Sequence, residues 1–240
     1  MPISRCIIVL RSAASTPGLA SVCALALSEA VQQGLDVPSE TSRVLWDAVE
    51  RSPDAAWSST ATAAIGVSAT AAVAALATEA ALDRRGGIDR ADAALDVLSG
   101  PSAARFVTDH ALLALAERAQ GLRLVYRCAN VVQSVCELRR VPAEVVTMIA
   151  EGWFRRPDKP SRISALDLLD YLPGETCRQL VTAALSDDCE AVRASSALRI
   201  SDVFDRDAGL ALVQRCLATE QCRRVIADLM SAQGELLLKL

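Results

Sequence analysis

The sequences PDKPSRISALDLL (157–169) and DDCEAVRASSALRI (187–200) share one pattern: an acidic turn, an arginine, and a run of small and apolar residues. Each is followed by a turn and a second apolar segment, at 175–185 and 208–217. Matching Arg162 to Arg193 gives a period of 31 residues, and matching Ser164 to Ser196 gives a period of 32. A period of this length, made of two helices, is typical of stacked helical-repeat proteins.

The second stretch resembles a HEAT-type repeat, because Val192-Arg193 follows the acidic turn and Ala197-Leu198 comes one helical turn later. In the first stretch Ser161 stands where the second has Val192. HEAT-like arrays mostly serve as concave scaffolds for other proteins, and some bind nucleic acid. The resemblance therefore implies a binding role for the segment from about 156 to 219.

Composition favours an all-α fold. The chain has 240 residues, of which 52% are hydrophobic but only 3% aromatic, so the apolar residues are mainly Ala, Leu and Val. Ala and Leu have high helix propensity, and small side chains suit close helix packing. No alternating β-branched run bounded by an Asn-Gly or Asp-Gly turn is present. Together with the resemblance, this predicts a right-handed α-solenoid of stacked antiparallel helix pairs, HEAT- or armadillo-like.

The helical segments divide into two regions. Residues 1–141 are expected to form divergent helix pairs, and residues 142–240 the HEAT-like repeats with a C-terminal capping helix from 220 to 240. No Pro-, Gly- or Ser-rich linker separates the regions, which favours one continuous array. The weaker repeat signal before Pro142 leaves a separate N-terminal helical subdomain as the alternative.

The last residues, Leu236 to Leu240, are unusually apolar for a free terminus. We expect this tail to dock on a neighbouring subunit, so that its deletion weakens assembly.

Charge does not point to a general grip on nucleic acid. The net charge is −4 with a pI near 5.2, and neither half of the chain is basic. Four Arg pairs occur, at 84–85, 139–140, 155–156 and 223–224. The first three precede Gly or Pro breaks, where cations complement the negative end of a helix dipole. The alternative is a basic ridge of aligned loops that holds an acidic protein or RNA phosphates.

Four residues are candidates for partner binding: Trp153, Arg155, Arg156 and Arg193. Trp153-Phe154-Arg155-Arg156 is the one place where aromatic residues meet arginines near a loop, and Trp and Arg are enriched in interface hot spots. Packing in the core or between repeats is the alternative for Trp153.

Catalytic and metal motifs are lacking in the sequence. The chain has one His, His110, without a neighbouring nucleophile or acid signature, and eight Cys without Cys-x-x-Cys spacing. Asp167 and Asp170, three residues apart on a helix, could pair as metal ligands, although a solvated face is the simpler interpretation. The loop acids, including Asp187 and Asp205, are expected to cap helices. We therefore expect no cofactor, no metal and no enzyme activity.

The segment 55–78 contains no charged residue, a length that could span a membrane. Ala, Ser and Thr dominate it, so two short packed helices meeting near Gly66 are expected instead, without a membrane span. The thiols are expected to be reduced, which indicates an intracellular, cytoplasmic protein. The first 28 residues, with Arg and Ser but no acid, leave an organelle matrix as the alternative.

The sequence thus predicts a non-enzymatic helical-repeat scaffold or assembly subunit that binds proteins through a preformed surface, as part of a larger complex. A nucleic-acid-binding repeat protein using Arg-rich loop edges is the alternative. Few aromatic residues are available for base stacking, which favours protein partners.

Overall fold

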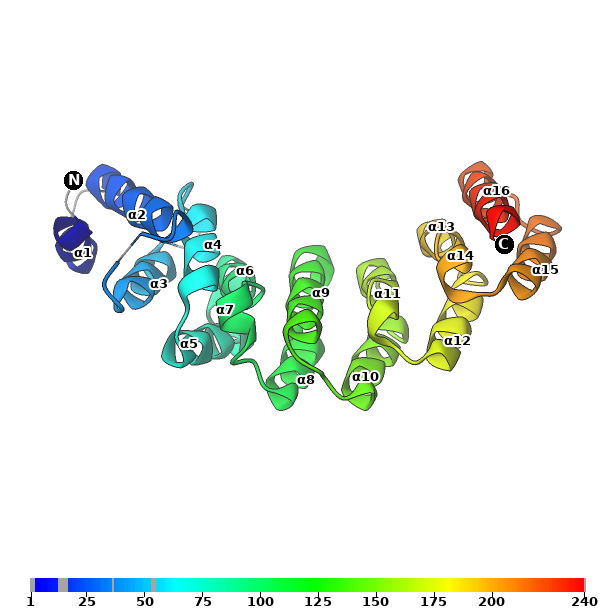
Figure 1. The fold of residues 1–240 in the computed structure, drawn as a ribbon, viewed down its shortest axis with the longest axis horizontal. Coiled ribbons are helices and arrows are strands. Elements are labelled where there is room, and N and C mark those ends of the chain that lie inside the picture. Colours follow the sequence, from blue (N-terminus) through cyan, green and yellow to red (C-terminus); the bar gives the residue numbers. More distant parts are fainter. Residues whose placement is uncertain (1–2, 13–16, 36, 53–54, 240) are drawn as a thin grey trace. The chain divides into compact units, whose positions relative to one another are not determined.

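A computed structural model describes residues 3–12, 17–35, 37–52 and 55–239 of the chain (Figure 1). Part of the segment considered as a transit peptide, residues 1–2 and 13–16, lies outside the described residues. The described residues contain sixteen α-helices, one short 3-10 helix and no strand, so the predicted all-α class is confirmed. The chain divides into two compact units, Met1–Val141 and Pro142–Leu240.

The first unit contains nine helices in its described part: α1 (Ile3–Arg11), α2 (Pro17–Gln32), α3 (Thr41–Arg51), α4 (Ser58–Ser68), α5 (Ala71–Leu82), α6 (Gly87–Leu98), α7 (Pro101–Ala104), α8 (Asp109–Arg118) and α9 (Gly121–Leu138). Consecutive helices pack as the pairs α1/α2, α3/α4, α5/α6 and α8/α9. The first members of the pairs contact one another in series, and so do the second members (Figure 1). The core lies between these two rows of helices.

The two short helices expected in the segment 55–78 are present as α4 and α5, but Gly66 lies inside α4 and does not itself break the helix. The break falls at Ala69 and Thr70, where the Thr70 hydroxyl accepts a hydrogen bond from the Val73 N–H and caps α5. Gly66 instead allows close packing: a Cβ added to Gly100 would lie 2.3 Å from the Gly66 Cα. The two glycines let α4 and the start of α7 approach until their backbones touch.

Charged side chains connect two second-row helices of this unit. Arg123 on α9 pairs with Asp89 and Asp92 on α6, both at 2.7 Å. Arg127 on α9 pairs with Asp96 at 2.5 Å and with Asp92 at 3.3 Å. The Asp92 side chain is only 8% exposed, and its two arginine partners compensate the cost of burying its charge.

The second unit contains α10 (Ala143–Phe154), α11 (Lys159–Leu166), the 3-10 helix η1 (Leu169–Tyr171), α12 (Gly174–Ala184), α13 (Glu190–Ala197), α14 (Ile200–Val203), α15 (Arg206–Leu217) and α16 (Arg223–Leu238). The helices pair as α10/α11, α12/α13 and α15/α16, and α11, α13 and α16 contact one another in series. Within this unit, Figure 1 shows these three helices on one side and α10, α12 and α15 on the other.

The 31-residue period of the sequence recurs in the helix boundaries of the second unit. α13 begins and ends 31 residues after α11, and α14 begins 31 residues after η1. In both copies the second helix of the pair is interrupted at a Ser-Ala-Leu sequence: α11 ends at Leu166 and α13 at Ala197, and a short helix follows each. Asp158 caps α11 and Asp205 caps α15 by accepting hydrogen bonds from backbone N–H groups, which confirms capping at Asp205.

Candidate functional site

Trp153 lies in the core of the second unit. Its side chain is 1% exposed and is among the largest fully buried side chains of the described residues. In this structure it therefore packs in the interior and offers no surface to a partner, which is the alternative that the sequence left open for it.

Arg193 holds two successive loops together. Its guanidinium donates to the carbonyl oxygens of Asp187 and Asp188, in the loop before α13, at 2.9 and 3.2 Å. It also pairs with Glu220, in the loop before α16, at 2.8 Å. The Arg193 side chain is only 19% exposed, so it connects elements of its own chain.

Arg162 makes the same contacts one period earlier. It donates to the carbonyl oxygens of Arg156 and Pro157 at 3.2 and 2.7 Å, and to the carboxylate of Asp187 at 3.1 Å. Both arginines therefore bind the loop before their own helix through carbonyl groups and the loop of the next pair through an acid. Arg162 and Arg193 each stand four residues after the N-cap of their helix. The equivalent position in α16 is Ile226, which has no charge, so this series of contacts ends at Glu220.

Glu220 is strongly bound in this arrangement. Hydrogen bonds from Arg193 lower the pKa of the Glu220 carboxyl to about 2, against the opposing effect of its burial. The backbone N–H groups of Cys222 and Gln221 donate to the same carboxylate and lower its pKa further. The site is thus a structural ion pair with a fixed charge on each side.

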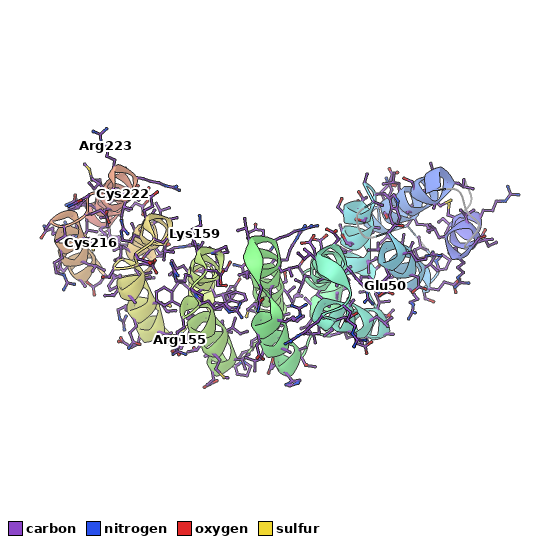
Figure 2. The ribbon with its side chains drawn as sticks, turned by 180° about the vertical axis from the view of Figure 1, so that it is seen from behind. Glu50, Arg155, Lys159, Cys216, Cys222 and Arg223 are labelled. Atoms are coloured by element: carbon purple, nitrogen blue, oxygen red, sulfur yellow. The ribbon has the colours of Figure 1, made fainter. Side chains whose placement is uncertain are left out.

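Arg155 and Phe154 lie beside a groove between α10 and α12. The groove has a volume of about 190 Å³ and is lined by Glu151, Phe154, Arg155, Thr176, Gln179, Leu180 and Ala183. Arg155 lies at the C-terminal end of α10, with its side chain 74% exposed, and pairs with Glu151 at 2.6 Å (Figure 2). Arg156 is half-buried, and its carbonyl oxygen accepts from Arg162.

The groove combines an apolar floor with a polar rim. Leu180, Ala183 and the half-buried Phe154 supply apolar surface, while Thr176 and Gln179 supply hydrogen-bonding groups. Along the neighbouring face of α10, Met148 is 61% exposed and Gly152 has no atom within 4 Å of where a Cβ would stand. An apolar pocket with a polar rim is the general anatomy of a protein-binding surface.

Asp167 and Asp170, the possible metal pair, lie near a separate cavity of about 230 Å³ lined by Leu169, Asp170, Gly174, Cys177, Arg199, Asp202 and Val203. Asp167 faces Arg199 at 3.8 Å, and burial raises the pKa of its carboxyl above the ordinary range. Among the described residues, no three metal-ligating side chains gather around one point. Arg199 supplies the positive charge that balances the acids here.

A cavity of about 430 Å³ in the first unit is bordered by α1, α3 and α6. Its arginines are engaged within the chain. Arg51 donates to the carbonyl oxygens of Leu10 and Asp47, and Arg90 pairs with Glu50 at 2.6 Å and with Asp83 at 2.8 Å. These contacts therefore hold α1, α3 and α6 together. Glu50 on α3 is labelled in Figure 2.

Of the four Arg pairs in the sequence, some arginines form ion pairs with acids of the same chain and others do not. Arg139 donates to the Val107 carbonyl and pairs with Asp109 at 2.6 Å, so it connects α9 to the start of α8. Arg223 and Arg224 are exposed at the N-terminus of α16. No ion pair forms between either of them and another residue in the described ranges.

The remaining reactive groups are dispersed. His110 is exposed in the first turn of α8. All eight cysteines are free thiols, and burial raises the pKa of Cys23 and of Cys136 to about 11, which keeps both protonated at neutral pH. Over the described ranges, every helix falls short of the length and apolar character needed to cross a bilayer.

Sequence reasoning identified Arg155 but missed the other side of the groove. Thr176, Gln179 and Ala183 repeat at helical spacing on α12, yet nothing in their identity distinguishes them from an ordinary solvated face. Their role depends on the packing of α12 beside α10, which a pattern within one helix does not reveal.

Comparison with known proteins shows a distant similarity in structure. No family model and no curated protein matches the sequence. One solved structure that is similar to this chain is the crystal structure of an engineered protein from a structural genomics consortium. It is 11% identical, the match covers 98% of this chain and 97% of that one, and the TM-score is 0.45.

Proposed function

We propose that this protein is a non-enzymatic helical-repeat scaffold that binds another protein through the groove between α10 and α12. In this proposal the helix pairs form a right-handed α-solenoid of antiparallel pairs, HEAT-like in the second unit. The equivalent contacts of Arg162 and Arg193, one period apart, support a repeat in that unit. Stacked repeats provide rigid surfaces between neighbouring pairs, which is where this groove lies.

The observation that carries the proposal is the chemistry of the groove. Its volume and its floor of Leu180, Ala183 and Phe154 suit one large apolar side chain of a partner. Arg155 and Gln179 on the rim can bind polar groups on either side of that anchor. Interfaces commonly derive most of their affinity from one such anchor in a pocket, surrounded by contacts that exclude water.

A protein partner fits these surfaces better than a nucleic acid. The clamp arginines Arg162 and Arg193 and the loop arginine Arg139 are neutralised by carboxylates of the same chain. The net charge of −4 would repel a polyanion. We further propose that the protein works in a reducing intracellular compartment, since its eight thiols are free.

The test compares partner recovery between the wild-type chain and groove variants. Ala183→Trp would fill the groove and Arg155→Glu would reverse the charge of its rim. We expect each to reduce recovery of the bound partner roughly tenfold, the effect of losing a hot-spot contact of ~1.4 kcal/mol. The measurement is affinity capture from native cells at low and high salt, quantified by mass spectrometry.

Arg206→Glu, an equal charge reversal at an exposed position on α15 outside the groove, is the control. It should leave recovery unchanged. Partners that are equally retained by both groove variants would rule out this groove as the binding site. Recovery that disappears on nuclease treatment or at high salt would favour the nucleic-acid alternative.

A further inference from the structure

The outer face of α16 is apolar at its centre and is not covered by the second unit. Met230, Leu237 and Leu238 are 60%, 54% and 83% exposed, and Ala227 and Gly234 are exposed between them. On a helix of 3.6 residues per turn these five residues fall on one side. The opposite side carries the buried residues Val225, Leu229, Ala232 and Leu236.

Buried contacts fix this face in position. Leu236 packs against Gly209 on α15 so closely that a Cβ on Gly209 would lie 2.8 Å from the Leu236 side chain. The Lys239 ammonium donates to the carbonyl oxygens of Ser201 and Phe204. Deletion of Leu236 to Leu240, the test that the sequence suggested, would therefore also damage the unit's own packing. Leu240 lies outside the described residues.

Gly234 has no role in the packing of its own unit. It is exposed inside a helix, and no atom lies within 4 Å of where its Cβ would stand. Glycine in a helix interior costs about 1 kcal/mol relative to alanine. Gly234 and Ala227, two helical turns apart at the centre of the face, leave room for another helix to approach closely.

The charges of α16 determine whether a parallel or an antiparallel helix would pack against this face more favourably. Arg223 and Arg224 stand at the N-terminus of α16, where the helix dipole disfavours cations. Figure 2 shows Arg223 extending outward from the helix. At the other end of α16 the Glu235 carboxylate accepts a hydrogen bond from Ser201, and the Lys239 ammonium is bound to carbonyl groups of its own unit. The backbone carbonyl groups of the C-terminal turn give this end the negative pole of the helix dipole, which attracts cations. A parallel helix pair would bring like charges together, whereas an antiparallel pair brings opposite charges together.

We propose that α16 packs antiparallel against α16 of a second copy of this chain. With the two-fold axis between Met230 and Ser231, Ala227 of each copy faces Gly234 of the other. Arg223 and Arg224 of each copy then lie beside the C-terminal turn of the other. The same surface meets itself in this arrangement, which closes at two copies.

The small area that this contact can bury makes the dimer weak. A helix of 16 residues is about 24 Å long. One face of that length buries less than the roughly 800 Å² per partner of a standard stable interface. We expect a monomer at low protein concentration and a rising share of dimer as the concentration increases. Salt should reduce the dimer fraction, because exposed charge interactions are screened.

The first test measures the mass of the full chain by sedimentation equilibrium over a range of concentrations. Gly234→Leu is the decisive variant, because it adds bulk where its own chain leaves open space and improves helix propensity. It should abolish the dimer while the melting temperature of the monomer stays unchanged or rises. A Gly234→Leu protein that dimerises like the wild type would overturn the proposal.

Two further variants locate the contact. Met230→Cys should give a dimer linked by an intermolecular disulfide under mild oxidation, with the wild type as the control for the native thiols. Val22→Asp changes an exposed apolar residue of α2 and should leave the dimer intact. A wild-type monomer at all concentrations, assemblies larger than a dimer, or a dimer lost in Val22→Asp would each contradict the α16 pairing.

Discussion

At the scale of single residues, the described arginines act mainly within their own chain. Arg193, a candidate for partner binding in the sequence, is the equivalent of Arg162 one period earlier. The structure shows that the period arises because each copy binds two loops of the same unit. Arg155, which lies outside the period, is the residue left exposed beside the groove.

Glu220 should make the stability of the second unit depend on pH. Its folded pKa of about 2 lies below the ordinary value of 4.5, so its stabilising contribution is present above pH 4.5 and is lost as the pH falls toward 2. The shift corresponds to about 3 kcal/mol in the free energy of unfolding. Glu220→Gln should lack this part of the pH dependence.

Urea unfolding of the wild type and of Glu220→Gln at several pH values between 2 and 7 measures the effect. The difference between the two proteins should be greatest at neutral pH and should shrink as the pH approaches 2. Glu175→Gln, which alters a well-exposed ion pair with Arg178, is the matched control and should change little. A difference that does not vary with pH would contradict the assignment.

At the scale of elements, the sequence predicted helices well where caps and periodicity agree. The acidic turns and the Pro173-Gly174 turn placed α12 and α15 within about two residues of their observed starts. It failed where a short break carried no Gly or Pro. No Gly or Pro occurs from Ser102 to Ala119, but α7 ends at Ala104, and α8 begins at Asp109 after the cap Thr108. Thr108 is an ordinary residue inside a helix pattern, so its capping role was not distinguishable.

The groove and the Gly66 contact could not be predicted, because both depend on which elements become neighbours in space. A glycine in an apolar segment favours a break when only local propensity is considered. In the folded chain Gly66 lies against Gly100, 34 residues away in the sequence, and this contact leaves no room for a Cβ. Helix propensity is a property of one segment, whereas the contact between Gly66 and Gly100 depends on two segments that meet in space.

Gly100→Ala should destabilise the packing of α4 against α7. The added Cβ would lie 2.3 Å from the Gly66 Cα, a backbone atom that cannot rotate away. Overpacking of this kind typically costs about 1–3 kcal/mol. The measurement is the free energy of unfolding from a denaturant titration, with unit-specific probes because the chain has two compact units.

Gly152→Ala is the opposite case and serves as the control. The added Cβ meets nothing within 4 Å, and alanine favours the helix, so this variant should stabilise the second unit by up to about 1 kcal/mol. Equal effects of the two substitutions would show that helix propensity, and not the contact between α4 and α7, governs Gly100.

At the scale of the whole molecule, the all-α class follows from composition and from the absence of strand signals. Composition predicts the class because alanine and leucine favour helix formation locally, in each segment where they occur. The course of the chain within the second unit was also partly predictable, since two copies of one pattern must pack in equivalent ways. The surfaces left exposed at α10, α12 and α16 could not be predicted, because exposure is decided by what the fold leaves uncovered.

The clamps of Arg162 and Arg193 have a mechanical consequence. Each joins its own loop to the next pair, so the three pairs of the second unit are bound in series from 157 to 220. A force applied at the C-terminal end would first extract α15 and α16, and then free Arg193 and load the pair before it. Pulling a single molecule should lengthen it stepwise, by about 100 Å for each period of 31 residues. One undivided rupture of the whole unit would show that the pairs do not yield in turn.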